Sequence, residues 1–266
     1  MDPCRALAAE YSGKAAAYAR YWSPVIRPMA LPLFPALPLA SAARVLDVGT
    51  GTGALWADLQ EAAPAAQLLG IDRSIGMLRR GAAPKGRVAV MDGQQLGLRR
   101  DSIDVAVLVF VLFHWPDPVR GLRELLPVLK PGGVLGLTSW GFDPGLPGAD
   151  IWAEELESAG AAPDPRDPSV MRQALMDTVL KLGDLLVAAG FRPLRLWSQP
   201  FVHQWELERL LAVQVGCGLP ARRLSSLEPG ASTVCESRVR TRMARLTPAE
   251  LSYRTEVLFG VAARPG

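Results

Sequence analysis

The residues of this chain best suited to chemistry are a set of alternating glycines with one carboxylate just before them. The stretch 44–56 reads RVLDVGTGTGALW, in which Asp47 stands inside an apolar run that leads to Gly49, Gly51 and Gly53. Glycine has no Cβ, so such a loop lets a ligand reach the main chain, and the N–H groups at the start of the following helix point toward that ligand. The pattern predicts a strand, a glycine loop and a helix that together hold a nucleotide-like cofactor.

Two more carboxylates stand where strand-like runs end. Asp72 follows the run 67–71, and Asp92, with Gly93 after it, follows the run 87–91. The carboxyl ends of parallel strands meet at one edge of a sheet, where ligands bind. We therefore expect Asp72 to accept both hydroxyls of a ribose and Asp92 to accept an adenine amino group.

The position of Asp47 discriminates between cofactors. The spacing Gly49-x-Gly51-x-x-Ala54 also satisfies the loose fingerprint of dinucleotide sites, which place a pyrophosphate at this loop. A pyrophosphate gains nothing from a neighbouring carboxylate, whereas an ammonium group, such as that of S-adenosylmethionine, gains a charge-assisted hydrogen bond. Asp72 does not discriminate, because nicotinamide sites hold their ribose in the same way.

Five motifs in order carry a resemblance to a known family. They lie within residues 44–140 and read VLDVGTGTG, GIDRSIGML, MDGQQL, FVLFHW and LKPGGVL. This set resembles the class I S-adenosylmethionine-dependent methyltransferases, and within them the small-molecule group related to ubiquinone and menaquinone biosynthesis. The resemblance extends weakly to residues 11–22 and 257–264. It implies S-adenosylmethionine as cofactor, S-adenosylhomocysteine as product and methyl transfer to O, N or C of a small organic acceptor.

The resemblance also implies a contact for each part of the cofactor. From residue type alone, Met77 could be ordinary core, Asp92 a turn residue and Asp72 a helix N-cap. The implied contacts are Gly49, Gly51, Gly53, Val109 and Phe110 with the methionine part, Asp47 with its amino group, Asp72 with the ribose, Arg73 or Met77 with one adenine face, and Asp92 and Gly93 with the adenine amino group.

Tyrosines give the N-terminal segment an aromatic side. Tyr11 and Tyr18 are seven residues apart and so share one face of a predicted helix over residues 7–22. This face could dock on the core or cover the cofactor, as the resemblance implies.

The chain has two histidines, His114 and His203, and they are the candidates for a catalytic base. Methyl transfer needs a base only when the acceptor atom carries a proton. His114 follows the fourth strand and could instead pack the next helix, while His203 could be an exposed loop residue. Four aromatic residues near strand ends suggest an apolar, flat acceptor: Trp140, Phe142, Trp197 and Phe201.

The remaining pattern predicts the elements that position these residues. Strands and helices alternate, which indicates a doubly wound α/β fold with a mostly parallel seven-stranded sheet. We expect a helical arm over residues 1–40 as a lid, a core over residues 41–266, and a helical insertion at about 205–247 as a substrate lid. The predicted strands are 45–48, 67–71, 87–91, 103–109, 134–139, 193–201 and 256–263, and the predicted helices are 54–63, 75–81, 119–129 and 176–189, with a tight turn at 131–133.

Composition narrows the class of partner. The net charge of +3 over 266 residues is too small for a nucleic-acid-binding face. Arginines nevertheless make the insertion basic, as a solvated surface or as a contact for an anionic substrate or a nucleic acid backbone: Arg222, Arg223, Arg238, Arg240, Arg242 and Arg245. The three cysteines show no metal spacing, and no leader-like or membrane-spanning run is visible. We expect a cytoplasmic monomer or homodimer that acts on a small molecule without metal, nucleic acid or membrane.

The alternatives to this function are a protein or RNA methyltransferase, a non-catalytic subunit that binds S-adenosylmethionine, and a nicotinamide enzyme. The absence of an Asn/Asp-Pro-Pro-Tyr/Phe loop after the fourth strand disfavours methylation of bases.

Overall fold

The computed structural model of the chain describes residues 2–81, 83–84 and 86–266, so Met1, the first residue of the predicted arm, lies outside the described residues. Its centre is a seven-stranded sheet with the strand order β3-β2-β1-β4-β5-β7-β6. The first five strands run parallel, and β7 is antiparallel to both of its neighbours. The predicted α/β fold with a mostly parallel sheet is confirmed. The strands are β1 (Arg44–Val48), β2 (Gln67–Asp72), β3 (Val88–Val90), β4 (Ile103–Val109), β5 (Leu129–Trp140), β6 (Arg192–Gln204) and β7 (Ser252–Ala263).

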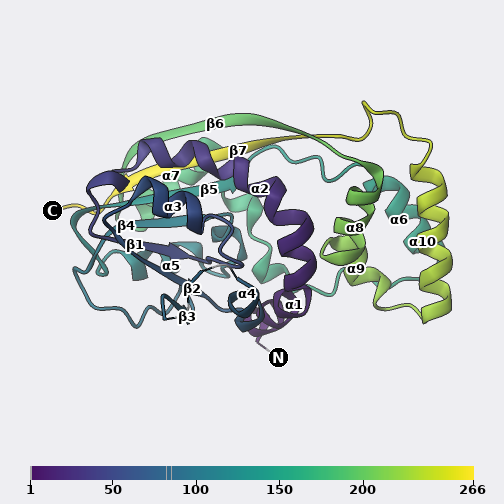
Figure 1. Cartoon of the computed structure of the whole chain (residues 1–266), viewed down its shortest axis with the longest axis horizontal. Coiled ribbons are helices and arrows are strands. Elements are labelled where there is room, and N and C mark those ends of the chain that lie inside the picture. Colours follow the sequence, from purple (N-terminus) through teal and green to yellow (C-terminus); the bar gives the residue numbers. More distant parts are fainter. Residues whose placement is uncertain (1, 82, 85) are drawn as a thin grey trace.

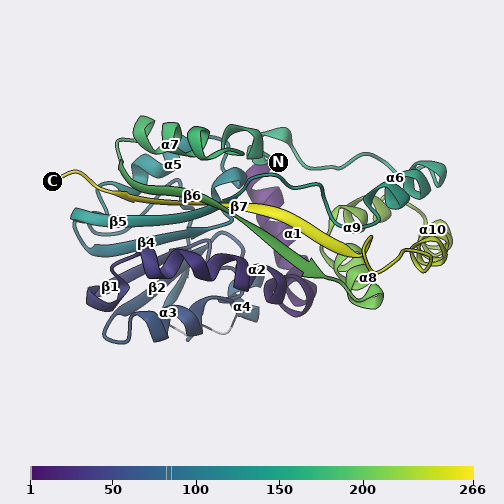
Figure 2. The ribbon, with the colours of Figure 1, turned by 90° about the horizontal axis from the view of Figure 1, so that it is seen from above.

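Helices cover both faces of the sheet (Figure 2). Successive side chains of β1 point to opposite faces, so Val45 packs with α2 and α3 while Leu46 packs with α5 and α7. A strand buried on both faces must be apolar throughout, which explains the continuous apolar runs of the sequence. The helices are α1 (Pro3–Ala17), α2 (Ser23–Ala30), α3 (Trp56–Ala62), α4 (Ile75–Arg80), α5 (Pro118–Leu125), α6 (Ala149–Ser158), α7 (Val179–Ala188), α8 (Leu207–Gly216), α9 (Leu219–Leu224) and α10 (Pro229–Met243).

The predicted boundaries around residues 119–133 were wrong. Helix α5 ends at Leu125 and not at Leu129, because Pro127 lacks an N–H and disfavours helical backbone at the residue before it. The glycines after Lys130 do not form a separate turn. Gly132, at φ +74°, lies inside β5, where the register with β4 shifts.

The chain adds a helical lobe to one end of the sheet (Figure 1). Helices α8, α9 and α10 lie in the predicted insertion, and α6, which the sequence patterns did not predict, packs against α9 and α10. Strands β6 and β7 are longer than predicted, and they extend past the other strands toward the lobe (Figure 2).

The first helix of the N-terminal arm, α1, lies between the sheet and this lobe, whereas α2 covers one face of the sheet (Figures 1 and 2). Helix α1 continues into a π-helical turn at Tyr18–Trp22 and then into α2. It packs against α4 of the core on one side and α8 of the lobe on the other. Helix α1 therefore lies near the carboxyl ends of the parallel strands. Within the described part of the chain, no helix has the length and apolar character to cross a membrane.

Candidate cofactor and acceptor site

The glycine loop requires glycine for conformational and steric reasons. Gly49, Gly51 and Gly53 have φ values of +74°, +56° and +67°, a region that costs other residues free energy. A Cβ on Gly49 would also lie 2.3 Å from Cγ2 of Val111. The N–H groups of Gly49 and Thr50 both donate to the carbonyl of Ile71, at 2.8 and 3.0 Å. The loop is thereby fixed to the end of β2.

Asp72 stands at that same strand end and faces the loop. One carboxylate oxygen accepts from the Gly51 N–H at 2.8 Å and the other from the Ser74 N–H at 2.7 Å. Burial raises the pKa of Asp72, against the effect of these two hydrogen bonds. The N-cap of α4 is Ser74, whose hydroxyl accepts from Met77 N at 3.3 Å. Since Ser74 caps the helix, the carboxylate of Asp72 has its remaining lone pairs for a ligand.

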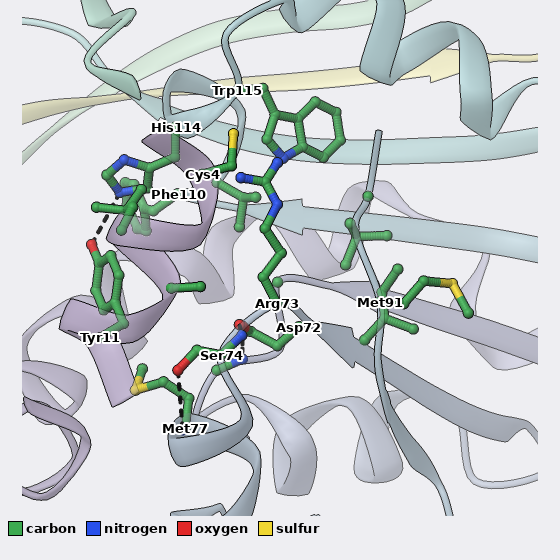
Figure 3. A pocket seen from close by; sticks show the side chains of 18 of the residues that line it. Cys4, Tyr11, Asp72, Arg73, Ser74, Met77, Met91, Phe110, His114 and Trp115 are labelled. Carbon is green, nitrogen blue, oxygen red and sulfur yellow. Dashed lines mark hydrogen bonds between the residues drawn. The ribbon is translucent and has the colours of Figure 1, made fainter. Parts of the chain in front are cut away.

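These residues line a hollow that we call the loop cavity, bounded by Tyr11, Gly49, Asp72, Met77, Gly93 and His114 among others. Figure 3 shows its side chains. Gly51 and Val109 line it as well, and a Cβ on Gly93 would lie 2.5 Å from the Trp115 ring. Gly53, the third glycine of the loop, does not line this cavity.

Asp47 is a buried acid beside the loop. It is 4% exposed and lines a smaller hollow, the side cavity, together with Tyr18, Gly49 and Thr50. No ion pair to Asp47 occurs among residues 2–81, 83–84 and 86–266. Burial raises its pKa to about 7, with a smaller contribution from the charge of Asp72. A ligand with an ammonium group would supply the cation that this carboxylate lacks, which is how the site fits S-adenosylmethionine.

The two residues expected at an adenine ring contact one another. Nη2 of Arg73 lies 2.9 Å from Oδ1 of Asp92, and the Arg73 side chain extends toward Trp115 (Figure 3). Asp92 does not line the loop cavity, although its neighbours Met91 and Gly93 do. Met77 is buried and lines the cavity, so it is both a core residue and part of the cavity wall.

Tyr11 and His114 form a hydrogen-bonded pair, although they are 103 residues apart (Figure 3). The His114 Nδ1 lies 3.2 Å from the carbonyl of Val170, and a carbonyl only accepts, so Nδ1 carries the proton. Nε2 then accepts from the Tyr11 hydroxyl at 3.0 Å. Burial lowers the pKa of His114 to about 4 and raises that of Tyr11 to about 12. Both groups are uncharged at neutral pH, and His114 is a weak base.

A larger hollow, the lobe cavity, adjoins the loop cavity. It measures about 410 Å³ and is bounded by Trp22, Trp140, Trp152, Arg166, Arg222 and Tyr253 among others. Four residues line both cavities: Tyr11, Tyr18, Phe110 and His114. Phe110 stacks on Trp140 at 4.2 Å between ring centroids, in a backbone conformation with φ +54°. A molecule in the lobe cavity would therefore meet a cofactor in the loop cavity at these four side chains.

The structure does not bring His203 to this junction. It lies on β6 with its ring 4.5 Å from that of Trp205, and it lines neither the loop cavity nor the lobe cavity. Trp197 and Phe201 pack on Phe259 of the sheet, and Phe142 is exposed, so of the four aromatic residues only Trp140 lines the lobe cavity.

Sequence reasoning missed the residues that attach the arm to the core. The Ser12 hydroxyl lies 2.8 Å from that of Ser74 and accepts from Gly76 N at 3.1 Å. Ser74 had a visible signal, as a serine just before a helix, but nothing in the sequence singled out Ser12. Among the described residues, no cluster of three or more potential ligands could hold a metal ion.

Comparison with known proteins agrees with this geometry. Residues 46–137 match the family model described as methyltransferase domain. The ubiquinone/menaquinone biosynthesis C-methyltransferase UbiE of Syntrophotalea carbinolica is 37% identical over 106 residues, which are 37% of this chain and 44% of that protein. The malonyl-(acyl-carrier protein) O-methyltransferase of Dechloromonas aromatica is 40% identical over 105 residues, or 40% of this chain and 39% of that protein. The match thus spans less than half the length of these curated relatives.

The fold comparison extends further along the chain. The (4+2)-cyclase SpnF superposes with a TM-score of 0.54 at 21% identity and covers 89% of this chain and 81% of its own. A cyclase among the structural neighbours shows that this fold alone does not determine the reaction. Over residues 46–137 the chain is similar in sequence to S-adenosylmethionine-dependent methyltransferases, and over most of its length it shares the fold of SpnF.

Proposed function

We propose that this protein transfers a methyl group from S-adenosylmethionine to a small organic acceptor. The observation that carries the proposal is Asp47, a buried carboxylate beside the glycine loop with no cation from the described chain against it. A nicotinamide cofactor would put a pyrophosphate at this loop, and the charge of Asp47 would repel it. An amino-acid moiety with its ammonium group is attracted instead.

The bound cofactor supplies a methyl group on a positively charged sulfur that is already a good leaving group. The chain's own residues have to bind the cofactor, orient the acceptor and exclude water. In this proposal Asp72 accepts the ribose hydroxyls, and Met77 with Arg73 encloses the adenine. Tyr18 and Phe110 line both the loop cavity and the lobe cavity, so the acceptor atom would approach the methyl group beside these two side chains.

A two-part experiment tests the proposal. Calorimetry should detect binding of S-adenosylmethionine and S-adenosylhomocysteine but not of NAD. A small-molecule extract incubated with the protein and methyl-labelled S-adenosylmethionine should then yield a labelled product below the mass of a protein or RNA. Binding without any labelled product would favour a non-catalytic subunit, and binding of NAD alone would refute the cofactor assignment.

Asp72→Ala is expected to weaken S-adenosylhomocysteine binding by about 1.5–3 kcal/mol, because the ribose hydroxyls lose a charged acceptor. This corresponds to roughly a tenfold to hundredfold rise in Kd. Asp104→Ala is the matched control, since Asp104 also accepts from two backbone N–H groups, those of Ala43 and Arg44, but at the opposite end of the strands. Equal affinities of the two variants by calorimetry would remove Asp72 from the site.

A further inference from the structure

The lobe cavity has an aromatic wall suited to a flat apolar molecule. Trp22 lies 6.4 Å from Trp140 and 6.5 Å from Tyr253 between ring centroids, and Trp140 stacks on Phe110. These rings come from the arm, β5, β7 and the end of β4. Stacked and tilted rings of this kind favour a planar apolar body between them.

Basic residues also line the lobe cavity. Arg166, Arg222 and Arg223 line the cavity, and Asp143 is the one acidic residue among those that line it in the described chain. Asp143 accepts a hydrogen bond from the Tyr253 hydroxyl at 3.0 Å. Glu10 and Asp164 do not line the cavity but pair with Arg222 and Arg166, so an anion in the cavity would be held by the arginine N–H groups that these carboxylates leave free.

Two of these arginines lie at the end of the lobe cavity that adjoins the loop cavity. Nη1 of Arg222 donates to Glu10 at 3.0 Å, next to Tyr11 in α1. Arg222 and Arg166 both pair with Asp164, and their charges act on Tyr11 and His114 so as to lower the pKa of each. Nε of Arg222 lies 3.3 Å from Asp164 without making a hydrogen bond, and its side chain is 11% exposed. A donor of Arg222 is thus left over at the junction.

We propose that the methyl acceptor is a flat apolar molecule with one acidic oxygen, a carboxylate or a phenolate, and that Arg222 and Arg166 hold this oxygen at the junction of the two cavities, where it is methylated. This inference rests on the proposed function. It assigns to Arg222 and Arg166 a binding role that separates them from the solvated arginines of α10.

Such an acceptor explains why the junction has no strong base. Tyr11 and His114 are both uncharged and are poor proton acceptors at neutral pH. An oxygen that arrives ionised needs none. It forms the new O–CH3 bond while the S–CH3 bond breaks, the sulfur keeps the electron pair, and no proton is released. Because a negative and a positive charge neutralise each other in this step, an enclosed apolar site favours it over water.

The binding experiment uses two fluorescent probes that share one flat body. Anilinonaphthalene sulfonate carries an anion, and N-phenylnaphthylamine does not. With the full-length protein saturated in S-adenosylhomocysteine, we expect the sulfonate to bind roughly tenfold more tightly than the neutral probe, and Arg222→Gln to remove this difference, as for loss of a hydrogen bond to a charged group. Arg238→Gln makes the same charge change on the exposed side of α10 and should leave both affinities unaltered. Equal affinity of the two probes, or a sulfonate affinity that Arg222→Gln leaves unaltered, would overturn the proposal.

Arg166→Gln is the second variant, in case Arg222→Gln does not fold by circular dichroism, and the same loss of discrimination is expected. A labelled-methyl assay separates the two sources of the oxygen by comparing aryl carboxylic acids, phenols and aryl amides of matched size. Label on the carboxylic acids or the phenols supports the proposal, and label on the amides alone refutes it. If S-adenosylhomocysteine does not bind, the proposed function fails, while the probes still report the anion site without it.

Discussion

Asp47→Asn is expected to weaken S-adenosylmethionine binding at pH 8 by roughly tenfold to a hundredfold, the effect of losing a charged hydrogen-bond partner. The carboxylate is 4% exposed, and no cationic side chain of the described residues pairs with it, although the Thr50 hydroxyl opposes the rise in its pKa. We expect the ammonium group of the ligand to pair with the Asp47 carboxylate. The amide keeps the shape of the side chain but carries no charge.

The same substitution should remove the pH dependence of binding. Burial raises the pKa of Asp47 to about 7, so in the free protein the carboxyl is protonated below that pH. A cation binds the ionised form, and the proton must first leave. The affinity of the unaltered protein should therefore rise from pH 5 toward pH 7 by up to about tenfold per pH unit and level off above pH 8. Asparagine has no proton to lose, so the variant should show a flat profile.

As pH rises, the stability of the ligand-free protein should fall, whereas its affinity for the cofactor should rise. The folded-state pKa of Asp47, about 7, lies above its ordinary value of 3.8, so the folded protein binds more protons and loses stability as pH rises from about 4 to 7. Without ligand, Asp47→Asn should raise the Tm at pH 8 and have little effect at pH 4. Asp184→Asn, on the exposed side of α7, is the control for a change of charge alone. A steep pH profile in the Asp47→Asn variant would show that another group controls binding.

The parts of the site that are local in sequence could be predicted, and the parts that depend on distant contacts could not. The glycine loop, Asp47 and Asp72 follow from short patterns whose geometry is set by one strand and one turn. The end of α5 was predicted wrongly, although Pro127 was a local signal for it. In contrast, the pairing of Tyr11 with His114 joins the arm to the core across 103 residues.

The two histidines illustrate this limit. Each histidine follows a strand predicted from the sequence, and their residue type gives the same chemistry. His114 lies after a central strand of the sheet and His203 on an edge strand, so only the strand order separates them. Helix α6 and the pairing of Arg222 with Glu10 likewise depend on how the lobe folds back on the arm.

Gly49→Ala should abolish measurable cofactor binding and destabilise the fold. A residue with a Cβ at φ +74° costs about 1–2 kcal/mol, and the added methyl would lie 2.3 Å from Cγ2 of Val111. Overpacking of this kind costs roughly another 1–3 kcal/mol if the neighbours shift. The shift would move the main chain of the loop, which forms part of the wall of the loop cavity.

Gly132→Ala separates the two costs. Gly132 has the same φ of +74°, but a Cβ there would meet nothing within 4 Å, and it lies in β5 away from the loop cavity. Its variant should lose only the conformational part, about 1–2 kcal/mol by denaturant unfolding, and should keep its affinity for S-adenosylhomocysteine. Combining Gly49→Ala with Val111→Ala should cost less stability than the sum of the two single changes, because the smaller side chain makes room for the methyl. If Gly49→Ala and Gly132→Ala unfolded at the same denaturant concentration and bound the ligand equally well, the contact with Val111 would not hold the loop in its binding conformation.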